Sequence, residues 1–173
     1  MVQYEDEVNV MLRRKIIETP FLDMVLVSDG SHLIKSDFLY DDEMHARYRD
    51  IVVEDDPILL ETAKQLKEYF AKKRKHFDLP LVMPGTDFQQ KVWHVLQGIP
   101  YGEVLTYKEI AEKADSPKGF RAAGGACRAN HFTIIVPCHR VLSTSGAYTG
   151  YSGDKTFMKE NLLEFESGQG KLL

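Results

Sequence analysis

The stretch around which the rest of the chain is organised is residues 134–141, with the sequence IIVPCHRV. Its β-branched run is typical of a buried strand, which would carry Cys138 and His139 to its end. A thiolate is a strong nucleophile, and an adjacent histidine could accept its proton. Neighbouring strand residues point to opposite faces, so the sequence leaves open a direct contact, a turn or a bridging water.

Composition describes a globular protein without a membrane segment. The 173 residues are 43% hydrophobic and 28% charged, enough to bury a core. No apolar run approaches the ~20 residues that span a bilayer, so we expect a cytoplasmic protein, or a nuclear one in a eukaryote. Two cysteines are too few for a disulfide framework, and no Cys/His cluster has zinc-site spacing, which predicts no metal.

Charge is distributed unevenly between the two halves. Residues 1–85 carry 12 Lys and Arg against 17 Asp and Glu, whereas residues 86–173 carry 10 against 9. The net charge of −4 does not itself indicate a nucleic-acid partner. The near-neutral second half nevertheless leaves room for a local basic face that could meet one.

The pattern of elements predicts two domains. Residues 1–80 are typical of an α/β domain with a small antiparallel sheet plus a helix, and residues 81–85, with two prolines nearby and a glycine, of a linker. Residues 86–173 predict a mainly α domain with a winged-helix-like helix-turn-helix.

Local signals place elements within the first domain. Asp29-Gly30 between apolar runs is typical of a hairpin. Residues 41–43, DDE, predict an acidic loop, and Asp56-Pro57 predicts the start of a helix that runs to about Lys75. Its basic end, residues 72–75, is either a solvated helix terminus or a phosphate contact.

The second domain predicts three helices in close succession. Residues 86–89 and 106–109 each form a capping-box pattern, and Ser116 before Pro117 predicts the start of a third helix that runs towards Asn130. A short helix, a tight turn and a second helix form the helix-turn-helix pattern, although most such pairs only pack together.

The third helix contains the segment RAAGGACR at residues 121–128. Each interior glycine costs about 1 kcal/mol relative to alanine, so two in a row favour close approach of another backbone. Arg121, Gly125 and Arg128 share one stripe. The stripe fits a nucleic-acid groove and fits tight helix–helix packing with two surface arginines equally well.

Two further segments follow the cysteine. Residues 143–153, rich in small residues, glycine and tyrosine, are typical of a loop that lines a pocket or of a plain surface loop. Residues 156–166 predict a final amphipathic helix.

Taken together, these segments resemble the O6-alkylguanine-DNA alkyltransferases, or methylated-DNA–protein-cysteine methyltransferases. The resemblance follows an ordered series: PYGEV at 100–104, TY at 106–107, RAAGGA at 121–126, Asn130, PCHRV at 137–141, SG at 145–146 and YSG at 151–153. It covers residues 86–166 in detail and the first 80 residues in layout only.

The resemblance implies a reaction. The protein would flip O6-alkylguanine, or O4-alkylthymine, out of double-stranded DNA from the minor-groove side and transfer the alkyl group to Cys138. Because a thioether is not readily broken, each molecule would act once. We expect a monomer that needs no cofactor.

The resemblance also implies the roles of individual residues. Catalytic roles fall on Cys138 as nucleophile, His139 as its water-linked base, Glu166 as the carboxylate that orients the histidine, Tyr107 as a donor to guanine N3, and Asn130 as a brace. Arg121 would fill the gap that the flipped base leaves in the base stack, and Pro137 and Tyr151 would be the apolar walls of the base pocket. The carbonyls of Cys138 and Val141 would accept hydrogen bonds from the base, and the Ser152 amide would donate one. The remaining residues that would contact DNA or the base are Gly124, Gly125, Arg128 and Gly153.

The chain departs from the family pattern at Asp154, where many members carry glycine, and in a segment from 153 to 159 that is one residue longer than in some relatives. Both departures bear on the size of alkyl group that the pocket accepts and on the assignment of Glu166 as the orienting carboxylate. Three alternatives stay open from the residues alone. They are a non-catalytic alkylated-DNA-binding protein, which Cys138 disfavours, a Cys-His-Glu hydrolase, and a transcription regulator using the helix-turn-helix.

Overall fold

The computed structural model describes residues 10–147 and 155–168. The chain divides into two compact units, Met1–Pro84 and Gly85–Leu173. The predictions for Tyr151, Ser152 and Gly153 lie outside the described residues. Within the described part of the chain, no helix is long and apolar enough to cross a membrane.

The first unit is built on a four-stranded sheet with the order β3-β2-β1-β4. The strands are β1 (Arg13–Ile17), β2 (Met24–Ser28), β3 (Leu33–Phe38) and β4 (Val52–Val53). The predicted antiparallel pairing is confirmed for β1 with β2 and for the β2–β3 hairpin. The short β4 pairs in parallel with β1, so the sheet is mixed.

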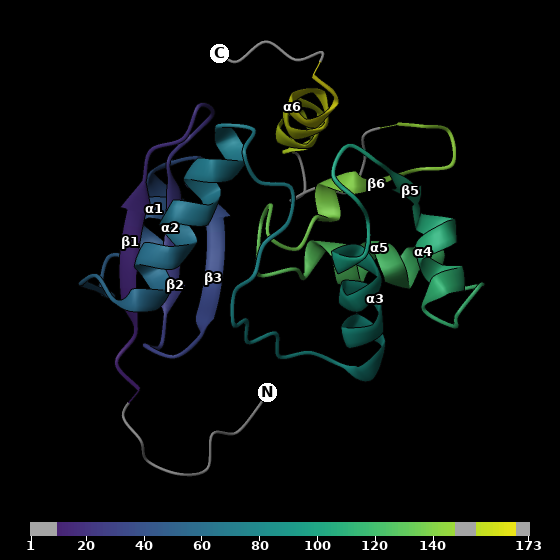
Figure 1. The fold of residues 1–173 in the computed structure, drawn as a ribbon. Helices are drawn as coiled ribbons and strands as arrows, with labels where there is room; N and C mark the ends of the chain where they lie inside the picture. The colour runs from purple at the N-terminus through teal and green to yellow at the C-terminus, as the bar shows by residue number, and fades with distance from the viewer. Residues whose placement is uncertain (1–9, 148–154, 169–173) are drawn as a thin grey trace. The chain divides into compact units, whose positions relative to one another are not determined.

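Two helices complete this unit: α1 (Asp42–Arg47) and α2 (Pro57–Phe70). The predicted start of α2 is confirmed, because the Asp56 side chain accepts a hydrogen bond from the Leu59 amide. The helix ends at Phe70 and not near Lys75. The prediction of an acidic loop at 41–43 is wrong, since Asp41 caps α1. Figure 1 shows α2 lying across the sheet, where Leu59, Leu66 and Tyr69 are among its buried residues.

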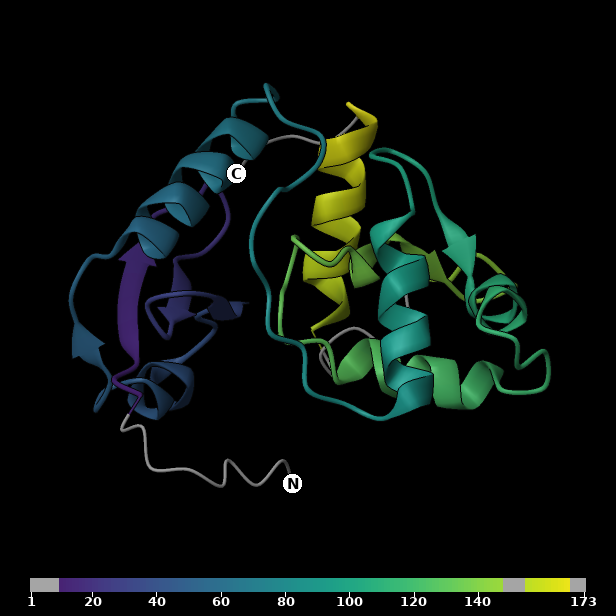
Figure 2. The same ribbon diagram turned by 60° about the horizontal axis from the view of Figure 1, so that its bottom comes forward.

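The second unit is mainly helical. Its elements are α3 (Asp87–Gln97), β5 (Leu105–Thr106), α4 (Tyr107–Lys113), α5 (Phe120–Arg128), the 3-10 turn η1 (Cys138–Arg140), β6 (Val141–Leu142) and α6 (Thr156–Ser167). Both predicted capping boxes are confirmed, at Thr86 and at Thr106. Helices α4 and α5 form the predicted helix-turn-helix, and α3 crosses α5 (Figure 2), where the Trp93 indole donates to the Ala126 carbonyl at 2.8 Å.

Two predictions about this unit are wrong in detail. Helix α5 begins at Phe120 with Gly119 as its N-cap and no capping side chain, so Ser116 is not the cap. The predicted strand at residues 134–141 is absent: among these residues only Val141 belongs to a strand, and Cys138 begins a 3-10 turn. Ile134 has a φ of 72°, a conformation that a β-branched residue rarely adopts and that a regular strand excludes.

Candidate active site

Cys138 is the first residue of the 3-10 turn and is 7% exposed. The Asn130 amide lies 3.2 Å from its sulfur and donates to the carbonyls of Val136, at 2.8 Å, and Phe132, at 3.3 Å. The Asn130 side-chain oxygen accepts from the Phe132 amide at 2.9 Å. One side chain therefore satisfies the backbone of the irregular segment before the cysteine, which explains why a turn forms in place of a strand.

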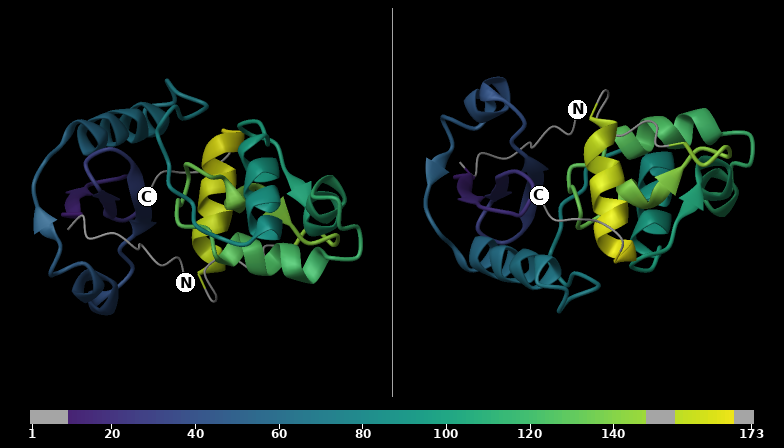
Figure 3. Two further views of the ribbon diagram at one scale, coloured as in Figure 1. Left: turned by 90° about the horizontal axis from the view of Figure 1, so that it is seen from below. Right: turned by 90° about the horizontal axis from the view of Figure 1, so that it is seen from above.

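The 3-10 turn packs against α6, coloured yellow in Figure 3. The buried side chains of His139 and Arg140 contact Glu166 of that helix. His139 Nε2 lies 2.7 Å from Glu166 Oε1. Arg140 binds the same carboxylate with Nη2 at 2.8 Å and Nε at 2.9 Å, and its Nη1 donates to the Ile99 carbonyl at 2.7 Å. We call His139, Arg140 and Glu166 the buried triad.

Electrostatics fix the protonation of the buried triad. Burial lowers the pKa of His139 and outweighs the opposite effect of Glu166. For Glu166, burial alone would raise the pKa, but His139 and Arg140 bring it far below its ordinary value. A neutral His139 must then donate its Nε2 hydrogen to the Glu166 carboxylate. Its Nδ1 is left unprotonated, and this atom has no hydrogen-bond partner among the described residues.

Lys159 belongs to the site although sequence reasoning missed it. Its side chain is fully buried, its Nζ lies 3.2 Å from Tyr107 Oη, and the same nitrogen is 5.2 Å from the centre of that ring. Burial lowers the pKa of Lys159 to about 8, and Cys138 and Cys127 act in the opposite direction. Helix phase is the signal that could have found it, because Lys159 and Glu166 stand two turns apart on the buried face of α6.

Tyr107 is the first residue of α4 and is half-buried. Burial raises the pKa of its hydroxyl, and Cys127 and Cys138 add to the effect. The phenol therefore stays protonated at neutral pH and can donate a hydrogen bond, while its oxygen accepts one from Lys159.

The exposed side of α5 carries Arg121 and Arg128. A Cβ added at Gly124 would meet Arg128 and Tyr107 side-chain atoms no closer than 3.8 Å, and one added at Gly125 would meet Arg128 at 3.9 Å. Those are ordinary van der Waals distances, so packing within the protein does not explain the glycine pair. The alternative of tight helix–helix packing consequently loses its main support.

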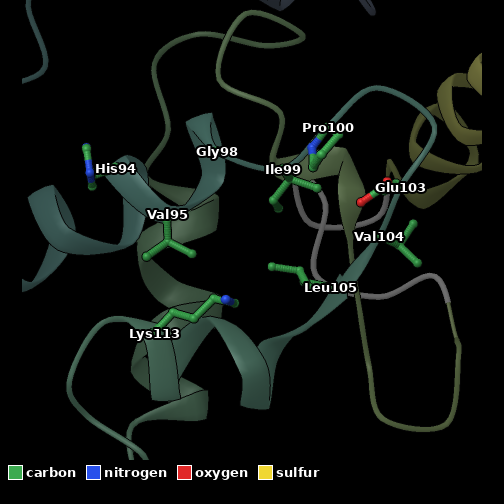
Figure 4. Close-up of a pocket in the computed structure, with 9 residues that line it drawn as sticks. All are labelled: His94, Val95, Gly98, Ile99, Pro100, Glu103, Val104, Leu105 and Lys113. Atoms are coloured by element: carbon green, nitrogen blue, oxygen red, sulfur yellow. The ribbon is translucent and has the colours of Figure 1, made fainter.

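The remaining features lie beside or away from this cluster. Pro137 and Val141 are buried on either side of the 3-10 turn. A pocket of about 440 Å³ opens between α3, α4 and the segment joining them (Figure 4). Its lining includes none of the residues predicted for the site. Across residues 10–147 and 155–168, no group of three or more His, Cys, Asp or Glu side chains could hold a metal ion.

Comparison with known protein families first defines the class. Residues 87–168 match the DNA binding domain of 6-O-methylguanine DNA methyltransferase, and residues 12–83 match its ribonuclease-like domain. The two matches fall on the two units of the structure. The chain is therefore a DNA-binding unit joined to a ribonuclease-like unit.

Individual relatives then define the family. The constitutive methylated-DNA–protein-cysteine methyltransferase of Bacillus subtilis is 53% identical over 110 residues, which are 64% of this chain and 67% of that protein. The Methanosarcina mazei enzyme is 41% identical over 156 residues, 90% of this chain and 98% of that one. The chain belongs to the methylated-DNA–protein-cysteine methyltransferase family.

Solved structures show the same fold. The Mycobacterium tuberculosis O6-methylguanine methyltransferase matches with a TM-score of 0.80 and 38% identity, covering 93% of this chain and 96% of that one. A structure of the M. tuberculosis protein in complex with DNA matches with a TM-score of 0.76 and 36% identity, covering 92% and 94%.

Proposed function

We propose that this protein repairs O6-alkylguanine in duplex DNA by transferring the alkyl group irreversibly to Cys138, and that it acts on O4-alkylthymine in the same way. One observation carries the proposal: Cys138 begins the same short turn as His139, whose Nε2 lies 2.7 Å from the buried Glu166 carboxylate. Membership of the family and the DNA complex of the M. tuberculosis relative support it.

The first step is ionisation of the thiol. The Cys138 proton passes through a water to His139 Nδ1, the ring atom without a partner among the described residues. Glu166 stabilises the imidazolium that results, and Arg140 holds the carboxylate in place. Asn130, 3.2 Å from the sulfur, donates a hydrogen bond to the thiolate.

The second step is displacement at the alkyl carbon. The thiolate sulfur forms a bond to that carbon, the carbon–O6 bond breaks, and its electron pair stays on the guanine. Donors that meet this developing charge stabilise the transition state. Tyr107 donates to guanine N3, and Lys159 donates a hydrogen bond to the Tyr107 oxygen. The Ser152 amide donates to O6. The product is a thioether, so each molecule reacts once.

Recognition of the flipped base and of the duplex falls to other residues. Pro137 and Tyr151 enclose the guanine, the carbonyls of Cys138 and Val141 accept from its amine, and Gly153 also contacts the base or the DNA. Outside the pocket, α5 lies in the minor groove of the DNA. Contacts within the protein would leave room for a Cβ at both glycines of α5. The glycine pair therefore favours close approach of a DNA strand there.

The DNA-facing arginines complete the interface. Arg121, at the start of α5, fills the gap that the extruded base leaves, and Arg128 meets the backbone phosphates. Flipping a base costs a few kcal/mol, so a side chain that fills the gap promotes the extruded state. We propose that the protein binds as a monomer.

Peptide mass spectrometry tests this function. After incubation with duplex DNA carrying O6-methylguanine, we expect one added methyl mass on the Cys138 peptide, mole for mole with the lesion lost. Cys138→Ala should leave the lesion intact, and Cys127→Ala, the matched loss of the other buried thiol, should not. Lesion loss with unmodified Cys138 would indicate a hydrolase, and binding without lesion loss would indicate a non-catalytic DNA-binding protein.

A further inference from the structure

An aromatic side chain stands exposed at the start of the helix that we place in the minor groove. Phe120, the first residue of α5, is 49% exposed, whereas Ala123, Ala126 and Cys127 further along the helix are buried. The proposed function gives this ring no role. It stands at the same end of α5 as Arg121.

Phe120 is also coupled to its neighbour. The guanidinium carbon of Arg121 lies 5.9 Å from the centre of the Phe120 ring, a cation–π contact between two exposed side chains. The two groups thus form one protruding unit with a flat apolar part and a charged part. An aromatic ring offers a surface for stacking on bases, which a guanidinium alone offers less well.

Glycines follow the Phe120–Arg121 pair along α5. Gly124 follows Phe120 by four residues and Gly125 follows Arg121 by four, so each large side chain has a glycine one turn later on its stripe. The two large exposed side chains therefore stand in the first turn of α5, and the next turn carries glycine at the corresponding positions. Proteins that kink or unstack a duplex from the minor groove commonly insert an apolar side chain such as phenylalanine.

We propose that Phe120 is a second wedge residue, which enters the base stack beside Arg121 and stacks on a base next to the gap. The inference rests on the proposed function and deepens it. Arg121 supplies charge and hydrogen bonds in the gap, while Phe120 replaces part of the stacking that neighbouring bases lose when the damaged guanine leaves. Phe120 acts on the duplex and not on the chemical step, so it is a positioning residue.

Single-turnover rates on three substrates test the role of Phe120. The substrates are O6-methylguanine in a duplex, the same lesion in single-stranded DNA, and the free base. We expect Phe120→Ala to slow repair of the duplex roughly ten-fold, the scale of one lost base–aromatic stack, and to change the free-base rate by less than about two-fold. Phe157→Ala is the matched control, because Phe157 is 50% exposed on α6.

A fluorescence measurement reads the unstacking directly. In the Cys138→Ala background, which stops the reaction, 2-aminopurine placed at the position of the damaged guanine should brighten on binding, because the extruded base loses its stacking neighbours, and should brighten less when Phe120 is also replaced by alanine. Equal duplex rates for wild type and Phe120→Ala, or equal slowing on all three substrates, would overturn the inference. A wild-type protein that leaves all three substrates unreacted would instead refute the proposed function, and the inference would fall with it.

Discussion

Positive charge is held in two contrasting ways around Cys138. Arg140, 4% exposed, and Lys159, fully buried, make hydrogen bonds inside the protein, to Glu166 and Ile99 and to Tyr107. Arg121 and Arg128 on α5 are exposed. We infer from this contrast that the buried charges act in the chemical step and that the exposed arginines bind DNA. Substitution of the buried cations or of Glu166 should slow alkyl transfer from every substrate. Substitutions on α5 should slow transfer from duplex substrates only.

The largest effect is expected from Glu166→Gln. Removing the carboxylate leaves Arg140 buried without its charge partner, which should lower the free energy of unfolding by roughly 3–5 kcal/mol. His139 also loses the acceptor that fixes its tautomer, so transfer should slow by about 100-fold or more on every substrate. Urea unfolding and single-turnover kinetics measure the two effects.

Glu164→Gln is the matched control, because Glu164 is exposed on the same helix. It should change stability by less than about 0.5 kcal/mol. A Glu166→Gln protein as stable and as fast as this control would show that the buried triad has no special role.

The next effect is expected from Arg121→Ala. Repair of a lesion in a duplex should slow by roughly 10- to 100-fold, because the gap left by the base is no longer filled, whereas the free-base rate should stay within about two-fold. Stability should change by less than about 0.5 kcal/mol at this exposed site. Arg47→Ala, an exposed arginine of the first unit, should leave both rates unchanged. Equal slowing on duplex and free base would deny Arg121 a role in flipping.

An intermediate and pH-dependent effect is expected from Lys159→Met. Below pH 8 the ammonium supports Tyr107 and the thiolate, so wild type should react roughly ten-fold faster than the variant. The ratio of the two rates should shrink as pH rises through about 8, where Lys159 loses its proton. Measuring both rates on the free base from pH 6 to 10 checks this. A ratio that does not change with pH would contradict the assignment.

The difference in folding stability between wild type and Lys159→Met should also depend on pH. The folded-state pKa of Lys159 lies at about 8, below its ordinary value of 10.5, so burying the charge costs stability. Between those two values the unfolded chain binds the proton and the folded protein does not. The stability of wild type relative to Lys159→Met should therefore rise with pH across that window.

The smallest effect is expected from Gly125→Ala. An added Cβ meets only Arg128, at 3.9 Å, and alanine favours a helix interior, so the variant should be more stable by about 0.5–1 kcal/mol. The same methyl group should obstruct a DNA strand and slow duplex repair several-fold. Thermal unfolding and single-turnover rates separate the two outcomes. A stabilised variant that repairs duplex DNA at the wild-type rate would remove the argument that DNA approaches this glycine.

Much of the fold follows from local rules that the sequence obeys. The capping boxes at Thr86 and Thr106 and the cap at Asp56 lie where side-chain chemistry places them. The segment before Cys138 could not be predicted in this way. Its β-branched residues match a strand, but the Asn130 side chain satisfies its backbone and holds a turn with Ile134 in a left-handed conformation. A long-range side-chain contact overrides propensity there.

The candidate site divides similarly. The family resemblance assigns roles to Cys138, His139 and Glu166. In the structure His139 Nε2 lies 2.7 Å from Glu166 Oε1, on the turn that begins at Cys138. Lys159 was missed because a lysine on an amphipathic helix is ordinarily solvated, and only packing against Tyr107 reveals that it is buried. The sequence shows Arg140 only as one residue of the PCHRV motif. Its contact with the Glu166 carboxylate in the structure indicates its role.

A titration with excess lesion shows whether Cys138 accepts an alkyl group once and permanently. Wild-type protein is incubated with increasing amounts of duplex DNA carrying labelled O6-methylguanine, and the label transferred to protein is counted over time. We predict a plateau at one methyl group per protein molecule, with loss of Cys138 reactivity towards iodoacetamide in the same proportion. Lesion loss that continues past one equivalent, or a plateau with Cys138 still reactive, would contradict the claim.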